Sequence, residues 1–181
     1  MSKKNKVKVD GILDLVDSCN LYKIGQGSYA QVYKTVSDMV IYFVRGDESK
    51  NFTAVGGKHA PNIAYLGKVR TKWGKYDCFV GELYRKPVKS APLAAKLESA
   101  WTDFMSYWRN GTYNTLTEYC DGLVNEFALR FRGENPELVD TIYKIWYSVR
   151  HFNEYCLEFP INNLAEDQNG NLILLDVIFS V

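Results

Sequence analysis

The chain has 181 residues, of which 46% are hydrophobic and 24% charged, and its formal net charge is +1. This length and composition predict a globular protein with one compact domain, or with two small lobes that share a cleft. A net charge so close to zero gives no strong field that would draw the protein to nucleic acid or to a membrane, so we expect neither as a partner. The aromatic content of 14% predicts an aromatic-rich core.

The cysteines and histidines are too few and too scattered to predict a structural zinc site. The sequence has 4 Cys and 2 His, and no two cysteines stand at the Cys-x-x-Cys spacing. The sequence shows no signal peptide and no apolar run of the roughly 18 residues that a membrane span needs. We therefore expect a cytoplasmic protein with buried or half-buried thiols.

The first half of the chain predicts a β-rich lobe. It begins with a lysine-rich segment, residues 1–10, which we expect to be a solvated tail. A short helix is expected between residues 45 and 58, ending at Gly56-Gly57. The predicted strands of this half are residues 21–24, 30–36, 39–44, 62–69 and 76–83, of which the last two form a hairpin.

The second half predicts a mostly helical lobe. From Lys86-Pro87 onward the apolar residues change from alternation to the helical repeat. The predicted helices are residues 91–108, 116–131 and 137 to about 155, and a hairpin of residues 164–165 and 172–175 follows them. The sequence thus predicts an α+β fold, with a β-rich lobe at residues 11–85 and a helical lobe at residues 86–181.

The segment KIGQGSYAQVYK, residues 23–34, places a glycine loop between two predicted strands. Rossmann and Walker sites need a helix N-terminus directly after the glycines, so this loop favours neither. The loop of protein kinases is a strand-turn-strand that covers the phosphates of ATP, and its glycines allow the backbone to approach them closely. Taken alone, the segment also fits a plain hairpin. The candidate nucleotide-binding residues of this segment are Ile24, Gly25, Gln26, Gly27, Ser28, Tyr29, Ala30 and Val32.

A second pattern lies near the C-terminus, where Asn163 and Asp176 flank the predicted hairpin. The hairpin would bring both residues to one edge of a cleft. An amide oxygen and a carboxylate suit Mg²⁺, which prefers oxygen ligands. Taken without the rest of the pattern, Asn163 would be a turn former and Asp176 a cap at the end of a strand.

The glycine loop, the change of period and the Asn163/Asp176 pair, in this order, resemble the eukaryotic-type protein kinases. The segments GQGSYAQVY, VIYF, PNIAYLGKV and NGNLILLDVIFSV are similar in particular to the early serine/threonine kinases of short-tailed coliphages. The resemblance implies a two-lobe kinase-like fold with a small antiparallel N-lobe, a reduced helical C-lobe and bound Mg²⁺ and ATP. It also implies a phage product that transfers the γ-phosphate of ATP to Ser or Thr of host proteins in the host cytoplasm.

The resemblance also assigns roles to single residues. Asn163 and Asp176 would hold Mg²⁺, and Glu158 would be the carboxylate that orients the acceptor hydroxyl. Glu158 stands where the family has Asp in a His-Arg-Asp-like triplet. Glu82 and Tyr84 fall at the hinge, whose backbone would hydrogen-bond the adenine ring.

Two departures from the family pattern leave the activity open. The third strand has Tyr42 where a kinase has the lysine that reaches the phosphates, and tyrosine carries no positive charge at neutral pH. Val177-Ile178 follows Asp176 in place of Phe-Gly, and we expect no activation segment. A minimal kinase and a pseudokinase that binds and inhibits or retargets a host protein are therefore both retained.

Other readings also remain open at this point. A small-molecule phosphotransferase would need the same carboxylate and amide, and an α+β domain without any nucleotide would keep the fold alone. A homodimer would cover apolar surface that the later helices of larger kinases cover.

Overall fold

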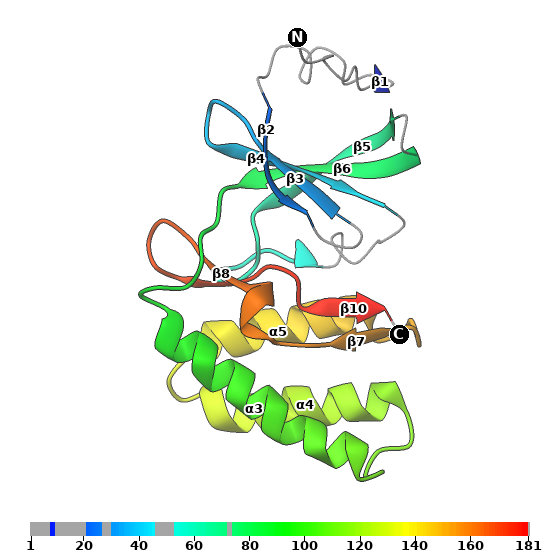
Figure 1. Ribbon diagram of the computed structural model, residues 1–181. Helices are drawn as coiled ribbons and strands as arrows, with labels where there is room; N and C mark the ends of the chain where they lie inside the picture. Colours follow the sequence, from blue (N-terminus) through cyan, green and yellow to red (C-terminus); the bar gives the residue numbers. More distant parts are fainter. Residues whose placement is uncertain (1–7, 10–20, 27–29, 46–52, 72–73, 181) are drawn as a thin grey trace. The chain divides into compact units, whose positions relative to one another are not determined.

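The structure is a computed structural model that describes residues 8–9, 21–26, 30–45, 53–71 and 74–180. The fold is α+β, and the chain divides into two compact units (Figure 1). The first unit comprises Met1–Glu48 and Asn62–Leu83, and the second comprises Ser49–Pro61 and Tyr84–Val181. Each unit is described in turn.

The first unit is built on one antiparallel sheet, with the strand order β1-β5-β6-β4-β3-β2 among the described residues. Consecutive strands β2, β3 and β4 lie side by side, and the β5–β6 hairpin places β6 next to β4. The strands are β1 (Lys8–Val9), β2 (Tyr22–Gln26), β3 (Ala30–Lys34), β4 (Met39–Val44), β5 (Ile63–Thr71) and β6 (Gly74–Glu82).

Strand β4 is the centre of this unit, since apolar side chains are buried on both of its faces. Val40, Tyr42 and Val44 pack with Phe79 on one face. Ile41 and Phe43 belong to a separate buried cluster on the other face. A strand covered on both faces is a continuous apolar run, which is the pattern MVIYFV.

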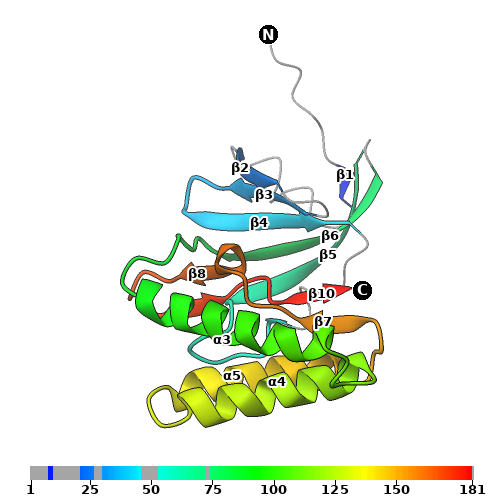
Figure 2. The same ribbon diagram turned by 60° about the horizontal axis from the view of Figure 1, so that its bottom comes forward.

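Three α-helices lie among the described residues of the second unit: α3 (Ala91–Arg109), α4 (Leu116–Phe131) and α5 (Pro136–Val149). A short turn joins α4 to α5, and the two helices pack side by side (Figure 2). Their buried stripes form the larger apolar core, with Phe127 and Trp146 among its largest side chains. None of the described helices is both long and apolar enough to cross a membrane.

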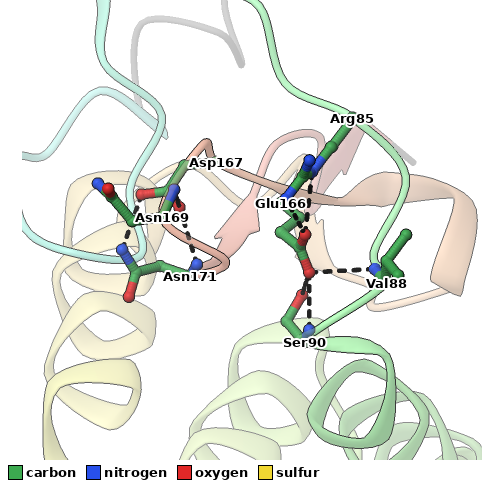
Figure 3. Close-up of polar contacts among 7 residues, drawn as sticks. All are labelled: Arg85, Val88, Ser90, Glu166, Asp167, Asn169 and Asn171. Carbon is green, nitrogen blue, oxygen red and sulfur yellow. Dashed lines mark hydrogen bonds and ion pairs between the residues drawn. The ribbon is translucent and has the colours of Figure 1, made fainter.

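Two small antiparallel strand pairs complete the second unit. Strand β7 (Tyr155–Leu157) pairs with β10 (Ile178–Ser180), and β8 (Leu164–Glu166) pairs with β9 (Leu172–Leu174). The 3₁₀ helix η1 (Ile161–Asn163) lies between β7 and β8. The β8–β9 turn is held by the Asp167 carboxylate, which accepts hydrogen bonds from the backbone N–H groups of Asn169 and Asn171 (Figure 3).

Most of the helices and strands lie where the sequence predicted them. Strand β4 and helix α4 have the predicted bounds, and α3 differs by one residue at its C-terminal end. Helix α5 ends at Val149, earlier than predicted, and residues 155–157 pair with β10 as a strand instead. Neither β7 nor β10 was predicted, because the two strands are distant in sequence and, unlike β8 and β9, are not joined by a turn signal.

Three further expectations concern the first half. Lys8–Val9 pairs with β5, so a strand lies within the segment expected to be a solvated tail, whose other residues fall outside the described ones. Residues 46–52 of the expected short helix also fall outside them. Residues 53–61 belong to the second unit, whereas the sequence analysis placed them in the first.

Candidate active site

The structure brings the three predicted catalytic residues together within the second unit. Glu158 follows β7, Asn163 ends η1, and Asp176 lies between β9 and β10. The side-chain Nδ2 of Asn163 donates a hydrogen bond to Glu158 Oε1 at 2.8 Å. The backbone carbonyl of Asn163 accepts hydrogen bonds from the N–H groups of Leu175 and Asp176, each at 3.1 Å.

The two small strand pairs explain why residues so far apart in sequence meet. Pairing of β7 with β10 places Leu157 opposite Ile178, and the Glu158 N–H donates to the Val177 carbonyl at 2.9 Å. Pairing of β8 with β9 places Leu164 opposite Leu174. The backbone after β7 and the backbone after β9 therefore run next to each other. The hairpin that the sequence predicted does bring its two flanking residues to one place.

The loop between β7 and β8 is fixed at its middle by two contacts. Phe159 is fully buried, and its ring meets the ring of Phe127 edge-on, with 4.9 Å between the centroids. The N–H of Ile161 donates to the Glu98 carboxylate on α3 at 2.8 Å. These contacts leave little freedom to the segment that carries Glu158 and Asn163.

The environment of Glu158 makes its carboxylate more basic than that of an exposed glutamate. Burial raises the pKa of Glu158, and the nearby negative charge of Asp176 also raises it, while the hydrogen bond from Asn163 lowers it. The net direction is upward. A carboxylate that holds its proton to higher pH is suited to accept a proton from a hydroxyl group.

The oxygen atoms of Asn163 and Asp176 are of the chemical kind that a magnesium ion prefers. Because the Asn163 amide directs its Nδ2 to Glu158, its Oδ1 would be the atom that holds a cation. Among the described residues, no group of three or more His, Cys, Asp or Glu side chains could hold a metal. Magnesium is usually held by one or two carboxylates, waters and substrate phosphates, so an amide oxygen and one carboxylate are a fitting protein contribution.

In the first unit, the glycine loop connects two neighbouring antiparallel strands, as predicted. Strands β2 and β3 place Gly25 opposite Val32 and Gln26 opposite Gln31. Gly27, Ser28 and Tyr29 lie outside the described residues. The side chain of Gln26 also lies outside them, while Ile24 is exposed and Ala30 and Val32 are half-buried.

The position of Tyr42 agrees with its predicted place on the central strand but gives no replacement for a lysine. Tyr42 is only 5% exposed, and it pairs with Val32 on one side and Phe79 on the other. The other buried side chains of its face of β4 are apolar. Lys34, at the end of the neighbouring strand β3, forms an ion pair with Asp38.

The two predicted hinge residues fall in different units. Glu82 ends β6 in the first unit, is exposed, and accepts a hydrogen bond from Asn62 Nδ2 at 2.7 Å. Tyr84 is half-buried and belongs to the second unit. Their role in holding adenine stays a prediction.

The sequence analysis missed the acidic residues that hold this region in place. Glu98 lies on α3 between Leu97 and Ser99, and nothing in its spacing indicates a bond to the loop after β7. Glu166 precedes a turn rich in Asp, Asn and Gly, and therefore looks like a solvated residue. Its position in the short strand β8, next to two apolar residues, was the only signal that it is buried.

Comparisons with known proteins leave the family open. No family model matches the sequence, and no curated protein matches it. Among solved structures, the chain matches a chain in the structure of the CAK complex from Chaetomium thermophilum bound to ATP-gamma-S, with a TM-score of 0.37 and 13% sequence identity. The match covers 94% of this chain and 51% of that chain, so this chain spans about half of its length.

Proposed function

We propose that the protein is a kinase-like ATP-binding protein that transfers the γ-phosphate of ATP to Ser or Thr of host proteins. The observation that carries this proposal is the cluster of Glu158, Asn163 and Asp176, in which a basic carboxylate lies beside two oxygen donors that suit Mg²⁺. Host proteins as substrates, and a phage as the source, rest on the sequence resemblance alone.

Each residue of the cluster has a separate role in this proposal. Magnesium, when bound through Asn163 Oδ1 and Asp176, would offset the negative charge of the phosphates. Glu158 would accept the proton of the Ser or Thr hydroxyl, while the oxygen of that hydroxyl forms a bond to the γ-phosphorus. The bond from that phosphorus to the bridging oxygen breaks, and ADP leaves with the electron pair. That the glycine loop binds phosphates through its backbone N–H groups rests on the sequence resemblance alone.

A pseudokinase is the second candidate, and a specific observation favours it. Tyr42 is buried in an apolar cluster where a kinase has its phosphate-binding lysine. The loop from Glu158 to Asn163 has the sequence EFPINN, which contains no lysine or arginine. Such a protein would bind a nucleotide and a host protein without transferring phosphate.

Transfer of labelled γ-phosphate from Mg·ATP, to the protein itself and to a host lysate, separates the two candidates. The variants are Asp176→Asn and Glu158→Gln, and the matched control is Asp140→Asn, an exposed aspartate on α5. If the protein is a kinase, the wild type and the control transfer phosphate and the two site variants do not. Binding of Mg·ATP without transfer by the wild type would support the pseudokinase. Failure of the wild type to bind Mg·ATP would contradict both candidates.

A further inference from the structure

Glu166 is a buried carboxylate of the second unit to which the proposed function gives no role. It ends strand β8, which begins directly after Asn163, and its side chain is 0% exposed. A carboxylate that is removed from water destabilises the fold unless hydrogen bonds and a counter-charge compensate it. Its partners therefore show what the charge holds together.

Five donor contacts converge on this carboxylate (Figure 3). Oε1 accepts from Arg85 Nε at 3.0 Å and is 2.8 Å from Arg85 Nη2. Oε2 accepts from the backbone N–H of Val88 at 3.0 Å, from the N–H of Ser90 at 2.7 Å and from the Ser90 hydroxyl at 3.0 Å. Backbone hydrogen bonds in both directions also join Arg85 to Glu166.

These donors all belong to residues 85–90, which we call the connector, because they lead from the predicted hinge into α3. Ser90 is the N-cap residue of α3, but its side chain makes no capping bond within the helix. Its hydroxyl donates to Glu166 instead. The carboxylate thus lies at the N-terminal end of α3, where the helix dipole favours a negative charge.

Helix α3 is tied to the candidate active site at a second point. About two turns after its start, Glu98 accepts the hydrogen bond from Ile161 in the loop after β7. The connector, the start of α3 and the loop before Asn163 are consequently joined through two carboxylates. Removal of the Glu166 charge would loosen the connector end of this arrangement.

We propose that Glu166 is a positioning residue for nucleotide binding, which holds the connector in the conformation that the base and ribose of ATP meet. This inference rests on the proposed function. A surface that is already ordered loses less conformational entropy when a ligand binds, so the bond network of Glu166 would appear as nucleotide affinity. Glu166 itself does not touch the nucleotide in this proposal.

Glutamine cannot replace Glu166 in this role, although it has nearly the same shape. Both carboxylate oxygens accept from donors, so either orientation of an amide would turn its NH₂ group toward N–H groups. The connector would then have to move, or its donors would lose their acceptor.

The test compares Glu166→Gln with the control Glu126→Gln, which removes the charge of a half-buried glutamate that pairs with Arg130 on α4. Calorimetric titration with Mg·ATP gives Kd, and steady-state transfer gives KM and kcat. For Glu166→Gln we expect Kd and KM to rise by about tenfold, with kcat at saturating ATP changed by no more than about twofold. The control should bind as the wild type does. Arg85→Lys, which keeps the positive charge beside Glu166, should bind Mg·ATP more tightly than Arg85→Ala.

Three outcomes would overturn the inference. An unchanged Kd in folded Glu166→Gln would do so, and so would a fall in kcat that follows the loss of thermal stability while KM stays constant. If Glu166→Gln does not fold, Ser90→Ala removes one donor and keeps the carboxylate, and an unchanged Kd in that variant counts against the inference in the same way. A wild type that does not bind Mg·ATP contradicts the proposed function itself, which distinguishes the two failures.

Discussion

At the scale of single residues, Gly25 shows how the structure separates what the fold requires from what a ligand would require. Gly25 is not one of the described glycines that adopt the left-handed backbone conformation. A Cβ atom added there would meet Val32 Cβ at 3.6 Å, an ordinary van der Waals distance. Among the described residues, nothing in the packing therefore requires a glycine at this position. A nucleotide whose phosphates lie against the loop backbone would need one.

Gly25→Ala is accordingly expected to leave the fold intact and to weaken binding of Mg·ATP by about tenfold, or about 1.4 kcal/mol. The melting temperature should stay constant or rise slightly, since alanine reduces the conformational entropy of the unfolded chain. Gly133→Ala is the matched control, because a Cβ at Gly133 would meet nothing within 4 Å. Thermal melts and calorimetric titration of both variants check this, and equal affinities for the two would contradict it.

The pKa of Glu158 offers a second residue-scale prediction that does not depend on activity. Burial and the charge of Asp176 raise this pKa, and the hydrogen bond from Asn163 lowers it. Asp176→Asn should therefore move the pKa of Glu158 down, toward the ordinary glutamate value, and Asn163→Ala should move it further up. Carbon-detected NMR titration of the side-chain carboxyl groups measures both. A shift in the same direction in both variants would contradict the arrangement.

At the scale of elements, the start of α4 shows how local sequence determines one end of a helix. Thr115 Oγ1 accepts the hydrogen bond of the Glu118 N–H, and the Glu118 carboxylate accepts from the Thr115 N–H, which together form a capping box. These reciprocal bonds satisfy backbone N–H groups that the first turn leaves without partners.

Thr115→Ala is expected to lower the free energy of unfolding by about 1 kcal/mol, because alanine cannot accept the bond from Glu118. Thr112→Ala is the control, since the Thr112 backbone N–H bonds to the Tyr107 carbonyl and no cap depends on its side chain. Urea denaturation of the two variants measures the difference. A loss of the same size in both would show that the cap does not stabilise α4.

The elements that could be predicted from sequence are those with a long apolar pattern or with a turn signal between neighbouring strands. The apolar run of β4, the helical stripes of α3 and α4, and the Asn163/Asp176 hairpin were all predicted with bounds close to the observed ones. Short strands such as β7 and β10 could not be predicted, because their pairing depends on residues distant in sequence. The same reason hides Glu98 and Glu166, whose partners lie on other elements.

At the scale of the whole molecule, the Glu166 network makes stability depend on acid pH. Hydrogen bonds from the Ser90 N–H, the Val88 N–H, the Ser90 hydroxyl and Arg85 lower the pKa of Glu166 from 4.5 to about 2, against the opposing effect of burial. A carboxyl group whose pKa is lower in the folded state than in the unfolded state binds more protons when unfolded. Its stabilising contribution is thus complete above the unfolded pKa and is lost as the pH falls toward the folded pKa.

The difference in stability between the wild type and Glu166→Gln should therefore be largest near neutral pH and should shrink steadily between about pH 5 and pH 2. Denaturant titrations at several pH values measure it. Glu137→Gln is the control, because the Glu137 carboxylate pairs with Lys58 on the exposed surface, where such pairs contribute little. A constant difference across this range would show that the Glu166 charge does not stabilise the fold.

The buried cysteines give each unit a chemical reporter of its own opening. Cys78 lies on β6 in the first unit, where burial raises its pKa to about 11, and Cys120 and Cys156 lie in the second unit with 3.3 Å between their sulfur atoms. Thiols that are enclosed and protonated react slowly with alkylating reagents, so they are modified only when their surroundings unfold. In a Cys19→Ser background, pulses of alkylation followed by mass spectrometry would time the exposure of Cys78 separately from that of the other pair. The times at which these cysteines are modified would therefore show whether the two units unfold in one step or in two.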